Sequence, residues 1–234
     1  MNSKTLYFAF KMSLPVLFGY LFLGSAFGIM LYEAGYNFIW AIIISLFVYA
    51  GSGQFLLVSM LTSHAALSDI AIMTFFVNSR HIFYGISFIE KFRSYSWRYP
   101  YLIFSLTDET YGVNSSFSDV PKDVNEGDAR FLIGLFDHIY WIIGSVIGSL
   151  AGQLIKIDFT GIDFSMTALF TVIFINQMRA SKSKLPGIIG IFCAIICLLI
   201  FGADKFLLPS LIVTVAILLL GKSRMGYIGK EEIK

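Results

Sequence analysis

The sequence predicts an all-α polytopic membrane protein with about six to eight transmembrane segments, some of them discontinuous. The first observation behind this fold class is composition. Of the 234 residues, 57% are hydrophobic and 14% are charged, whereas a soluble domain carries roughly a quarter of its residues as charges. The mean hydropathy is +0.77. The second observation is that the apolar residues form long runs, and the third is that polar residues interrupt several of those runs.

A helix that crosses a bilayer needs about 20 mostly apolar residues. The clear candidates are Met12–Tyr32, Phe38–Leu61, Leu67–Ile89, Phe131–Gly152, Asp163–Met178, Leu185–Phe201 and Phe206–Gly221. The stretch Tyr101–Phe117 is shorter, follows Pro100 and carries Asp108 and Glu109. We expect it either to cross or to enter and return as a half-helix, which is tolerated only where protein or water surrounds the backbone.

The positive charges do not fit one simple topology. A count of eight crossings places both termini on the cytoplasmic side, in agreement with Lys4 and Lys11 near the amino terminus. The same count leaves Lys91, Arg93 and Arg98 outside, against the positive-inside rule. One re-entrant segment among the first four would remove this conflict.

A weak similarity between two parts of the chain suggests an internal repeat. Leu14–Tyr32 and Phe131–Gly152 are both rich in glycine, and each is followed by three further apolar segments. Residues 12–117 and 131–221 could therefore be repeat halves, as is typical of secondary transporters, although small residues also simply let helices pack closely. No linker separates two units, so residues 1–234 are expected to form a single integral membrane transport domain.

Several classes of function find no support in the sequence. The formal net charge is +2, and the basic residues lie in short loops, so no nucleic-acid partner is expected. Cys193 and Cys197 lie four apart in an apolar run and are expected to be small core residues; we predict no metal site and no cofactor. No G-x-x-x-x-G-K-[ST] loop is present, so any driving force is secondary or comes from a partner.

Polar residues inside apolar runs are the candidates for function, because a charge in mid-membrane costs about 2.5–3.5 kcal/mol on insertion scales. Gly51, Ser52, Gly53 and Gln54 lie halfway along the second run. Two glycines in one turn weaken a helix and free backbone groups to bind a ligand. We therefore expect a break here, with tight packing of the glycines as the alternative role.

A second polar cluster contains Asn78, Arg80 and His81, with Tyr84 one turn further on. Asn78 and His81 are three residues apart and Arg80 and Tyr84 four apart, so each pair shares a helix face. Arg80 lies near the middle of its run. An unpaired guanidinium there would be costly, so we expect a counter-charge on a neighbouring segment.

Asp108 and Glu109 are the expected counter-charges. Adjacent helical residues point about 100° apart, so one carboxylate could neutralise Arg80 while the other faces a cavity. If the segment were instead a cytoplasmic loop, both acids would simply be solvated. A further acid, Asp137, lies beside His138 inside its run. This pair suits a proton relay, although an isolated, hydrogen-bonded histidine is the commoner case.

Three motifs in this order and spacing resemble the AzlC family of branched-chain amino acid permeases. They are Phe-x-Tyr-Ala-Gly-Ser-Gly-Gln-Phe at 47–55, Asn-Ser-Arg-His-x-x-Tyr-Gly at 78–85 and Leu-Thr-Asp-Glu-Thr-Tyr at 106–111. Asp-His-x-Tyr-Trp at 137–141 and Asp163–Phe170 extend the resemblance, which runs from about Leu14 to Leu220. Ser52 and Gly53 stand where family members often have alanine, and Ser79 stands where many have leucine.

The resemblance implies a multi-pass subunit of the bacterial inner membrane. Such a subunit works with a small hydrophobic partner, AzlD, to export leucine, isoleucine, valine and related analogues, and it is not an enzyme. The small residues Gly144, Ser145, Gly148, Ser149 and Gly152 form one helix face. We expect this face to pack against another helix, either within this chain or in the AzlD-like subunit.

A branched-chain amino acid is a zwitterion, so its carboxylate requires a cation or free amides and its ammonium requires a carboxylate or free carbonyls. The predicted substrate-binding residues are Gly51, Ser52, Gly53, Gln54, Asn78, Arg80, Asp108 and Glu109. Transport against a gradient also needs an ion or a proton. The predicted proton-coupling residues are His81, Glu109, Asp137 and His138.

Two other classes of function compete with transport. The first is an intramembrane serine hydrolase, in which Ser52 among glycines would be the nucleophile and His81 its base. A rhomboid-type pattern would have glycine at position 50, where this chain has alanine, and would not predict Arg80 beside the histidine. The second is a channel or structural membrane protein, which predicts no coupling to ions.

Overall fold

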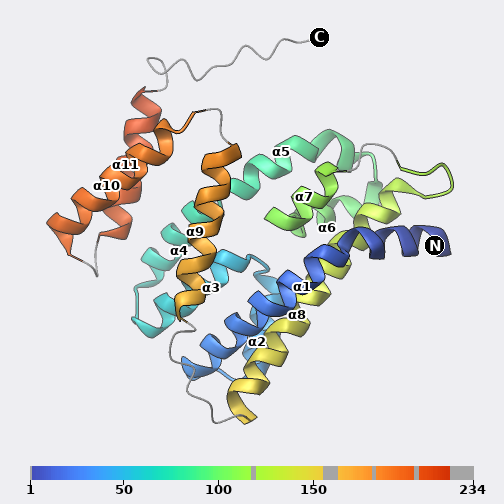
Figure 1. Cartoon of the computed structure of the whole chain (residues 1–234), viewed down its shortest axis with the longest axis horizontal. Helices are drawn as coiled ribbons and strands as arrows, with labels where there is room; N and C mark the ends of the chain where they lie inside the picture. The colour runs from blue at the N-terminus through green and yellow to red at the C-terminus, as the bar shows by residue number, and fades with distance from the viewer. Residues whose placement is uncertain (1, 117–119, 155–162, 181–182, 203–205, 222–234) are drawn as a thin grey trace. The chain divides into compact units, whose positions relative to one another are not determined.

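The computed structural model of the chain describes residues 2–116, 120–154, 163–180, 183–202 and 206–221 (Figure 1). The described residues form helices and turns and no strand, which confirms the all-helical prediction. The helices are α1 Ser3–Glu33, α2 Phe38–Phe47, α3 Gly51–Thr62, α4 Leu67–Asn78, α5 Arg80–Arg93, the 3₁₀ turn η1 Ser96–Arg98, α6 Tyr99–Phe104, α7 Asp108–Ser116, α8 Glu126–Leu154, α9 Asp163–Ala180, α10 Leu185–Phe201 and α11 Leu207–Gly221.

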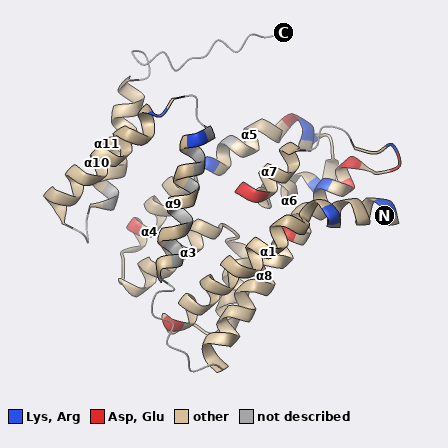
Figure 2. Ribbon diagram, in the orientation of Figure 1, with Lys and Arg blue, Asp and Glu red and all other residues tan. Residues whose placement is uncertain are grey.

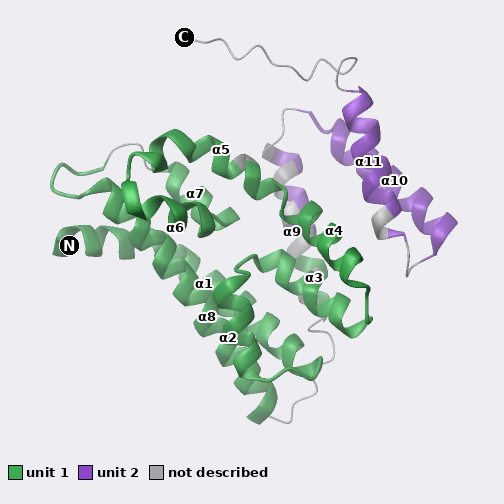
Figure 3. Cartoon of the chain, turned by 180° about the vertical axis from the view of Figure 1, so that it is seen from behind, with its two compact units in different colours: residues 1–168 green, residues 169–234 purple. Residues whose placement is uncertain are grey.

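The chain divides into two compact units, Met1–Ala168 and Leu169–Lys234 (Figure 3). Within the second unit, α10 packs along α11, and Cys193 and Cys197 are buried with free thiols, in agreement with their predicted core role. Unit 1 contains all the predicted site residues. The repeat halves 12–117 and 131–221 stay a prediction.

Two described helices, α1 and α8, are long and apolar enough to cross a membrane. They run parallel and side by side along one side of unit 1 (Figure 1). Small residues permit this contact: a Cβ added at Gly28 would lie 2.0 Å from the carbonyl oxygen of Ser145, and one at Gly148 would lie 2.0 Å from that of Ser25. The predicted small-residue face of α8 is therefore occupied by α1 of the same chain.

The second predicted span, Phe38–Leu61, is broken between α2 and α3. Tyr49 at the break has φ of +34°, a backbone conformation that a side chain disfavours, and Ala50 gives α3 no side-chain cap. In the last turn of α2, just before the break, Ser45 Oγ donates to Ser145 Oγ at 2.9 Å, and Gln54 Nε2 in the first turn of α3 donates to the same Ser45 hydroxyl at 3.4 Å. The chain thus turns back at the break, which confirms the discontinuity predicted from Gly51 and Gly53.

The stretch Tyr101–Phe117 is also two short helices. From η1 into α6 the contacts with α8 advance along α8: the ring of Trp97 on η1 meets that of Phe131, and the hydroxyl of Tyr101 on α6 lies 3.0 Å from His138 Nδ1. Along α7 they move back again, because Asn114 accepts a hydrogen bond from Arg130 at 2.9 Å. The described part of this segment, up to Ser116, therefore turns back at Ser105–Thr107; that it enters the membrane as a half-helix stays a prediction.

The third predicted span, Leu67–Ile89, bends at Ser79, where α4 ends and α5 begins. It continues in one general direction to Lys91, whose ammonium lies 2.5 Å from the carboxylate of Glu126 at the start of α8 (Figure 1). The helix propensity of residue 79 does not explain the bend, because serine is compatible with a helix interior. Instead, the Ser79 hydroxyl donates to the carbonyl oxygen of Phe76 at 2.7 Å, and such a local side-chain bond competes with the backbone hydrogen bonds of a helix.

One end of unit 1 concentrates the charges, and we call it the charged end (Figure 2). Its ion pairs join Lys4 to Asp123, Lys91 and Arg130 to Glu126, and Arg98 to Asp128. Arg130 is 1% exposed, and its guanidinium also donates to the carbonyl oxygen of Asn114 at 2.9 Å. The amino end of α1, the carboxyl end of α5 and the amino end of α8 therefore lie at the same end of the unit.

The α1–α8 contact yields a first prediction. Gly148→Leu should destabilise the isolated chain by about 3 kcal/mol or prevent its folding, because the new side chain meets backbone atoms of α1 that cannot move aside. Gly19→Leu is the matched control, since nothing lies within 4 Å of a Cβ there. The midpoint of thermal unfolding in detergent measures both. If Gly148→Leu folded normally and lost only a partner subunit, α8 would not be packed on α1 as described.

Candidate functional site

The amino ends of three half-helices are linked by side chains in the interior of unit 1. They are the ends of α3, α5 and α7, which begin at Gly51, Arg80 and Asp108. A helix amino end carries unsatisfied amides and a partial positive charge. An acid such as Asp108 is favoured there, whereas Arg80 is not and depends on acceptors from elsewhere.

Arg80 obtains those acceptors from the other two helices. Its Nη2 atom donates to Ser52 Oγ at 2.6 Å and lies 2.8 Å from Asp108 Oδ2. The side chains of Arg80 and Asp108 are 19% and 30% exposed, so the pair is largely but not wholly buried. The ion pair predicted for Arg80 is confirmed, and Asp108 is its partner.

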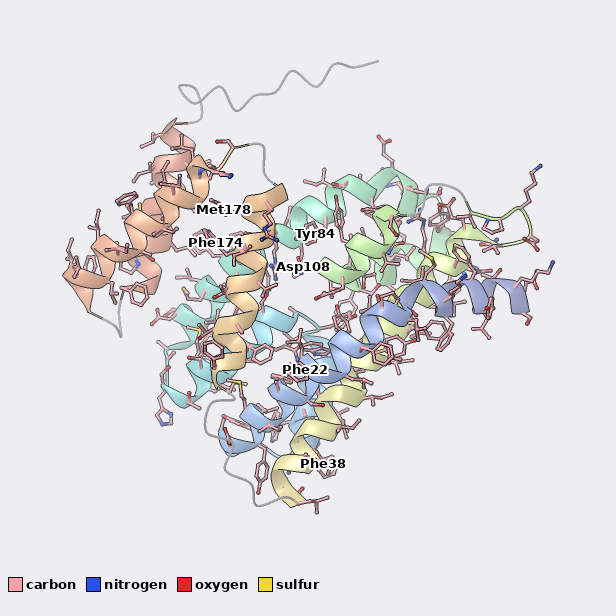
Figure 4. The ribbon with its side chains drawn as sticks, in the orientation of Figure 1. Phe22, Phe38, Tyr84, Asp108, Phe174 and Met178 are labelled. Atoms are coloured by element: carbon pink, nitrogen blue, oxygen red, sulfur yellow. The ribbon has the colours of Figure 1, made fainter. Side chains whose placement is uncertain are left out.

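Tyr84 completes the surroundings of Asp108 (Figure 4). Its hydroxyl donates to Asp108 Oδ1 at 2.5 Å, while its ring stacks on Tyr111 with centroids 4.5 Å apart. Arg80 and Tyr84 therefore reach the same carboxylate from one face of α5, as their four-residue spacing predicted. Both oxygens of Asp108 are engaged.

The remaining residues of the first two clusters lie close by. A Cβ on Gly53 would lie 2.8 Å from the side-chain nitrogen of Asn78, so the absence of a side chain brings α3 against the end of α4. Gln54 is fully buried. Gly51 packs on the indole of Trp141. The amides of Gly51, Ser52 and Gly53 lie in the first turn of a helix without a side-chain cap, which is the part of a helix that binds anions in many proteins.

Glu109 belongs to a different network from its neighbour Asp108. Its Oε2 atom accepts from the hydroxyl of Tyr20 on α1 at 2.7 Å. Tyr20 in turn lies 2.6 Å from Thr107 Oγ1, which is 3.1 Å from Thr110 Oγ1. Thr110 Oγ1 lies 2.8 Å from Asp137 Oδ2 on α8. Glu109 and Asp137, two of the predicted coupling residues, are thus joined by an unbroken chain of hydroxyls.

His138 joins the two hairpins. Its Nε2 atom lies 3.1 Å from the carbonyl oxygen of Ser45, which can only accept, so Nε2 carries the proton. Nδ1 then accepts from the hydroxyl of Tyr101 at 3.0 Å. Tyr49 stacks on the imidazole with centroids 4.1 Å apart. In this arrangement a neutral imidazole has both nitrogens satisfied and positions α2 and α6.

His81, like His138, is a predicted coupling residue that this geometry places outside the hydroxyl chain. Its ring meets that of Tyr84 edge-on at 5.7 Å. Ser52, its supposed partner in a hydrolase, accepts a hydrogen bond from Arg80 instead. An arginine does not act as a general base because it stays protonated. The arrangement around Ser52 therefore gives the hydrolase alternative no support.

Buried polar side-chain atoms without a hydrogen-bond partner gather around the hairpin turns. Within the described part of the chain they include Tyr49 Oη, Gln54 Oε1, Asn78 Oδ1, Arg80 Nε, Ser105 Oγ, Asp137 Oδ1 and Trp141 Nε1. Buried polar atoms are nearly always paired with protein or water. Their clustering makes this region the most polar part of the interior of unit 1.

Two participants are not among the residues predicted from the sequence. The first is Tyr20, for which the available signal is that a tyrosine hydroxyl in the middle of an apolar run requires a partner just as a charge does. The second is Arg130, which lies at the edge of its run, where an arginine is expected to be solvated. In the structure it instead ties α8 to α7 through Asn114.

Helices that break around a buried polar site define a class of membrane protein to which many secondary transporters belong. A profile of the AzlC protein family matches residues 15–155. The chain belongs to the AzlC family and is a multi-pass membrane protein, and the resemblance noted in its motifs is confirmed.

Several relatives share most of their length with this chain. An uncharacterized membrane protein of Helicobacter pylori (strain J99) is 38% identical over 93% of this chain and 95% of its own length. The branched-chain amino acid transport protein AzlC of Bacillus subtilis is 36% identical over 90% of this chain and 82% of its own length. The inner membrane protein YgaZ of Escherichia coli is 23% identical over 74% and 72%. No solved structure matches the chain.

The Arg80–Asp108 pair yields a second prediction. Arg80→Ala should lower the free energy of unfolding by about 3 kcal/mol, because it leaves a partly buried carboxylate without its cation. Arg93→Ala is the matched control, since Arg93 is an exposed arginine of the same helix and should change stability by less than about 0.5 kcal/mol. Denaturation in detergent measures both. Equal stability of the two variants would contradict the buried ion pair.

Proposed function

We propose that the chain is the large subunit of a secondary transporter that exports branched-chain amino acids (leucine, isoleucine, valine and analogues) and is coupled to an ion or to protons. The observation that carries this proposal is the Arg80–Asp108 pair, held at the amino ends of broken helices among buried, unpaired polar atoms. The relative named as a branched-chain amino acid transport protein supports the substrate class.

The zwitterion would bind by replacing existing contacts. Its carboxylate would take the place of Ser52 on Arg80 and accept from the amides of Gly51 and Gly53, which lie at the positive end of α3. Its ammonium would bind Asp108 or the accessible Glu109, and Gln54 and Asn78 would offer their unpaired oxygens. An arginine already paired with a carboxylate is suited to this exchange, because neither charge is left alone at any stage.

We further propose that the chain crosses the membrane six times. In this topology α1 crosses, α2–α3 re-enters from the side opposite the charged end, α4–α5 crosses back, α6–α7 re-enters from the charged end, and α8 crosses. Residues Lys4, Lys91, Arg93 and Arg98 would then lie on one side, as the positive-inside rule requires of the cytoplasmic face. Crossings by α9, α10 and α11 would return the carboxyl terminus to the same side.

The first half of this arrangement has the pattern of an inverted repeat. A crossing helix followed by a re-entrant hairpin occurs as α1 with α2–α3, and again in the opposite direction as α4–α5 with α6–α7. Inverted repeats place substrate sites near the bilayer midplane, where their discontinuous helices meet. The turns of the two hairpins approach each other, since the rings of Tyr49 and Phe104 lie 6.1 Å apart.

An AzlD-like small hydrophobic subunit is the proposed partner. The glycine face of α8 is not available to it, because α1 covers this face. Apolar side chains on α10 and α11 remain exposed within unit 2; they include Ile191, Ile195 and Leu199 on α10. We propose that α10 and α11 make the contact with this subunit.

The third prediction concerns transport itself. Proteoliposomes containing the chain and its copurifying small subunit should move leucine, and Asp108→Asn should abolish this flux by removing the charge that pairs with Arg80. Asp69→Asn, at an exposed acid of α4, is the matched control and should retain it.

Substrate analogues test the binding mode in the same vesicles. Isoamylamine lacks the carboxylate and isocaproate lacks the ammonium, so neither should compete with leucine at concentrations where valine does. Competition by both analogues as strong as that by valine would contradict recognition of a zwitterion. Absence of any amino-acid flux would overturn the proposed function.

A further inference from the structure

The hydroxyl chain between Glu109 and Asp137 permits a count of protons. It contains four hydrogen bonds in series: Glu109 to Tyr20, Tyr20 to Thr107, Thr107 to Thr110, and Thr110 to Asp137. Each bond requires one donated proton. The three hydroxyls supply one proton each, so the remaining proton must belong to one of the two carboxyl groups.

Only two arrangements satisfy all of these bonds. If Asp137 holds the extra proton, every hydroxyl donates toward Glu109, which is then the carboxylate. If Glu109 holds it, every hydroxyl donates toward Asp137. The two arrangements differ by the transfer of one proton along the chain, during which each hydroxyl accepts one proton and gives up another.

We propose that Glu109 and Asp137 share one proton, which moves between them through Thr110, Thr107 and Tyr20 and couples a proton gradient to transport. In the transfer, the Asp137 carboxyl gives its proton to Thr110, Thr110 gives its own to Thr107, Thr107 to Tyr20, and Tyr20 to the Glu109 carboxylate. Asp137 becomes the carboxylate and Glu109 the acid, and no other atom changes. This inference rests on the proposed transport function.

The surroundings of Asp137 favour the protonated form in the present conformation. The residue is 0% exposed, its Oδ1 atom has no partner, and no described lysine or arginine pairs with it. The titratable groups that face it are the hydroxyls of Tyr20 and Tyr49 and, through the chain, Glu109; Tyr101 on α6 lies further away, and His138 is the next residue of α8. A lone carboxylate in such a place would be costly.

The two ends of the relay differ in access. Asp137 is enclosed between α1, α7 and α8, whereas Glu109 is exposed in the structure. Glu109 also follows Asp108 directly on α7. Any shift of α7 that accompanies exchange of substrate at Asp108 would therefore change the link between Glu109 and Tyr20, so proton movement and substrate movement share one structural element.

The fourth prediction compares two modes of transport in proteoliposomes of the complete complex. Thr110→Val and Tyr20→Phe each remove one hydroxyl and should lose leucine accumulation driven by a pH gradient. Both should keep leucine–leucine exchange, which needs no net proton movement. The double variant should be no worse than either single one, because one missing link already interrupts the relay. Thr214→Val is the matched control, since its hydroxyl bonds a backbone carbonyl on α11.

The outcomes separate the relay from the proposed function. Leucine accumulation by Thr110→Val equal to that of the wild type, or accumulation driven by a sodium gradient without a pH gradient, would overturn the relay while leaving transport intact. Absence of leucine–leucine exchange in the wild-type complex would instead overturn the proposed function. Infrared spectra then still test the relay, because the band of a protonated carboxyl should be present in the wild type and absent in the double variant Glu109→Gln, Asp137→Asn, which removes both groups that can hold the proton; its absence from the wild type would contradict the shared proton.

Discussion

The pairing of Arg80 is the constraint around which the interior of unit 1 is built. A guanidinium at the amino end of α5 cannot use its own helix, whose first turn offers only donors. It finds acceptors in Ser52 and Asp108, which are placed within reach because α3 and α7 begin where their hairpins turn. The breaks therefore complement one another. Arg80 at the start of α5 gains two acceptors, and Ser52 and Asp108 at the starts of α3 and α7 gain a donor.

The two neighbouring acids of α7, Asp108 and Glu109, belong to two separate networks of polar contacts. Asp108 pairs with Arg80, while Glu109 leads through hydroxyls to Asp137 on α8. Thr107 serves both the fold and this network, because its Oγ1 atom also accepts from the amide of Thr110 in the first turn of α7. A motion of α7 would therefore act on both networks together, which is the physical basis for coupling in this account.

Much of this could be predicted from the sequence, for reasons that are local. Composition predicts a membrane fold, and the cost of burying Arg80 predicts an acid partner. The bend at Ser79 could not be predicted, because serine is compatible with a helix interior, and neither could the choice of Asp108 over Glu109, which depends on where α7 begins. The role of Tyr20 depends on contacts across more than eighty residues of sequence, which no local pattern reveals.

Whether the two hairpins turn back is tested most directly by the sidedness of single cysteines in a background without Cys193 and Cys197. A membrane-impermeant thiol reagent should label Tyr36→Cys and Ser63→Cys from one face, because α2–α3 starts and ends there. It should label Ser94→Cys and Ser116→Cys from the other face, on either side of α6–α7. Labelling of positions 36 and 63 from opposite faces would show that α2–α3 crosses the membrane and would contradict the account.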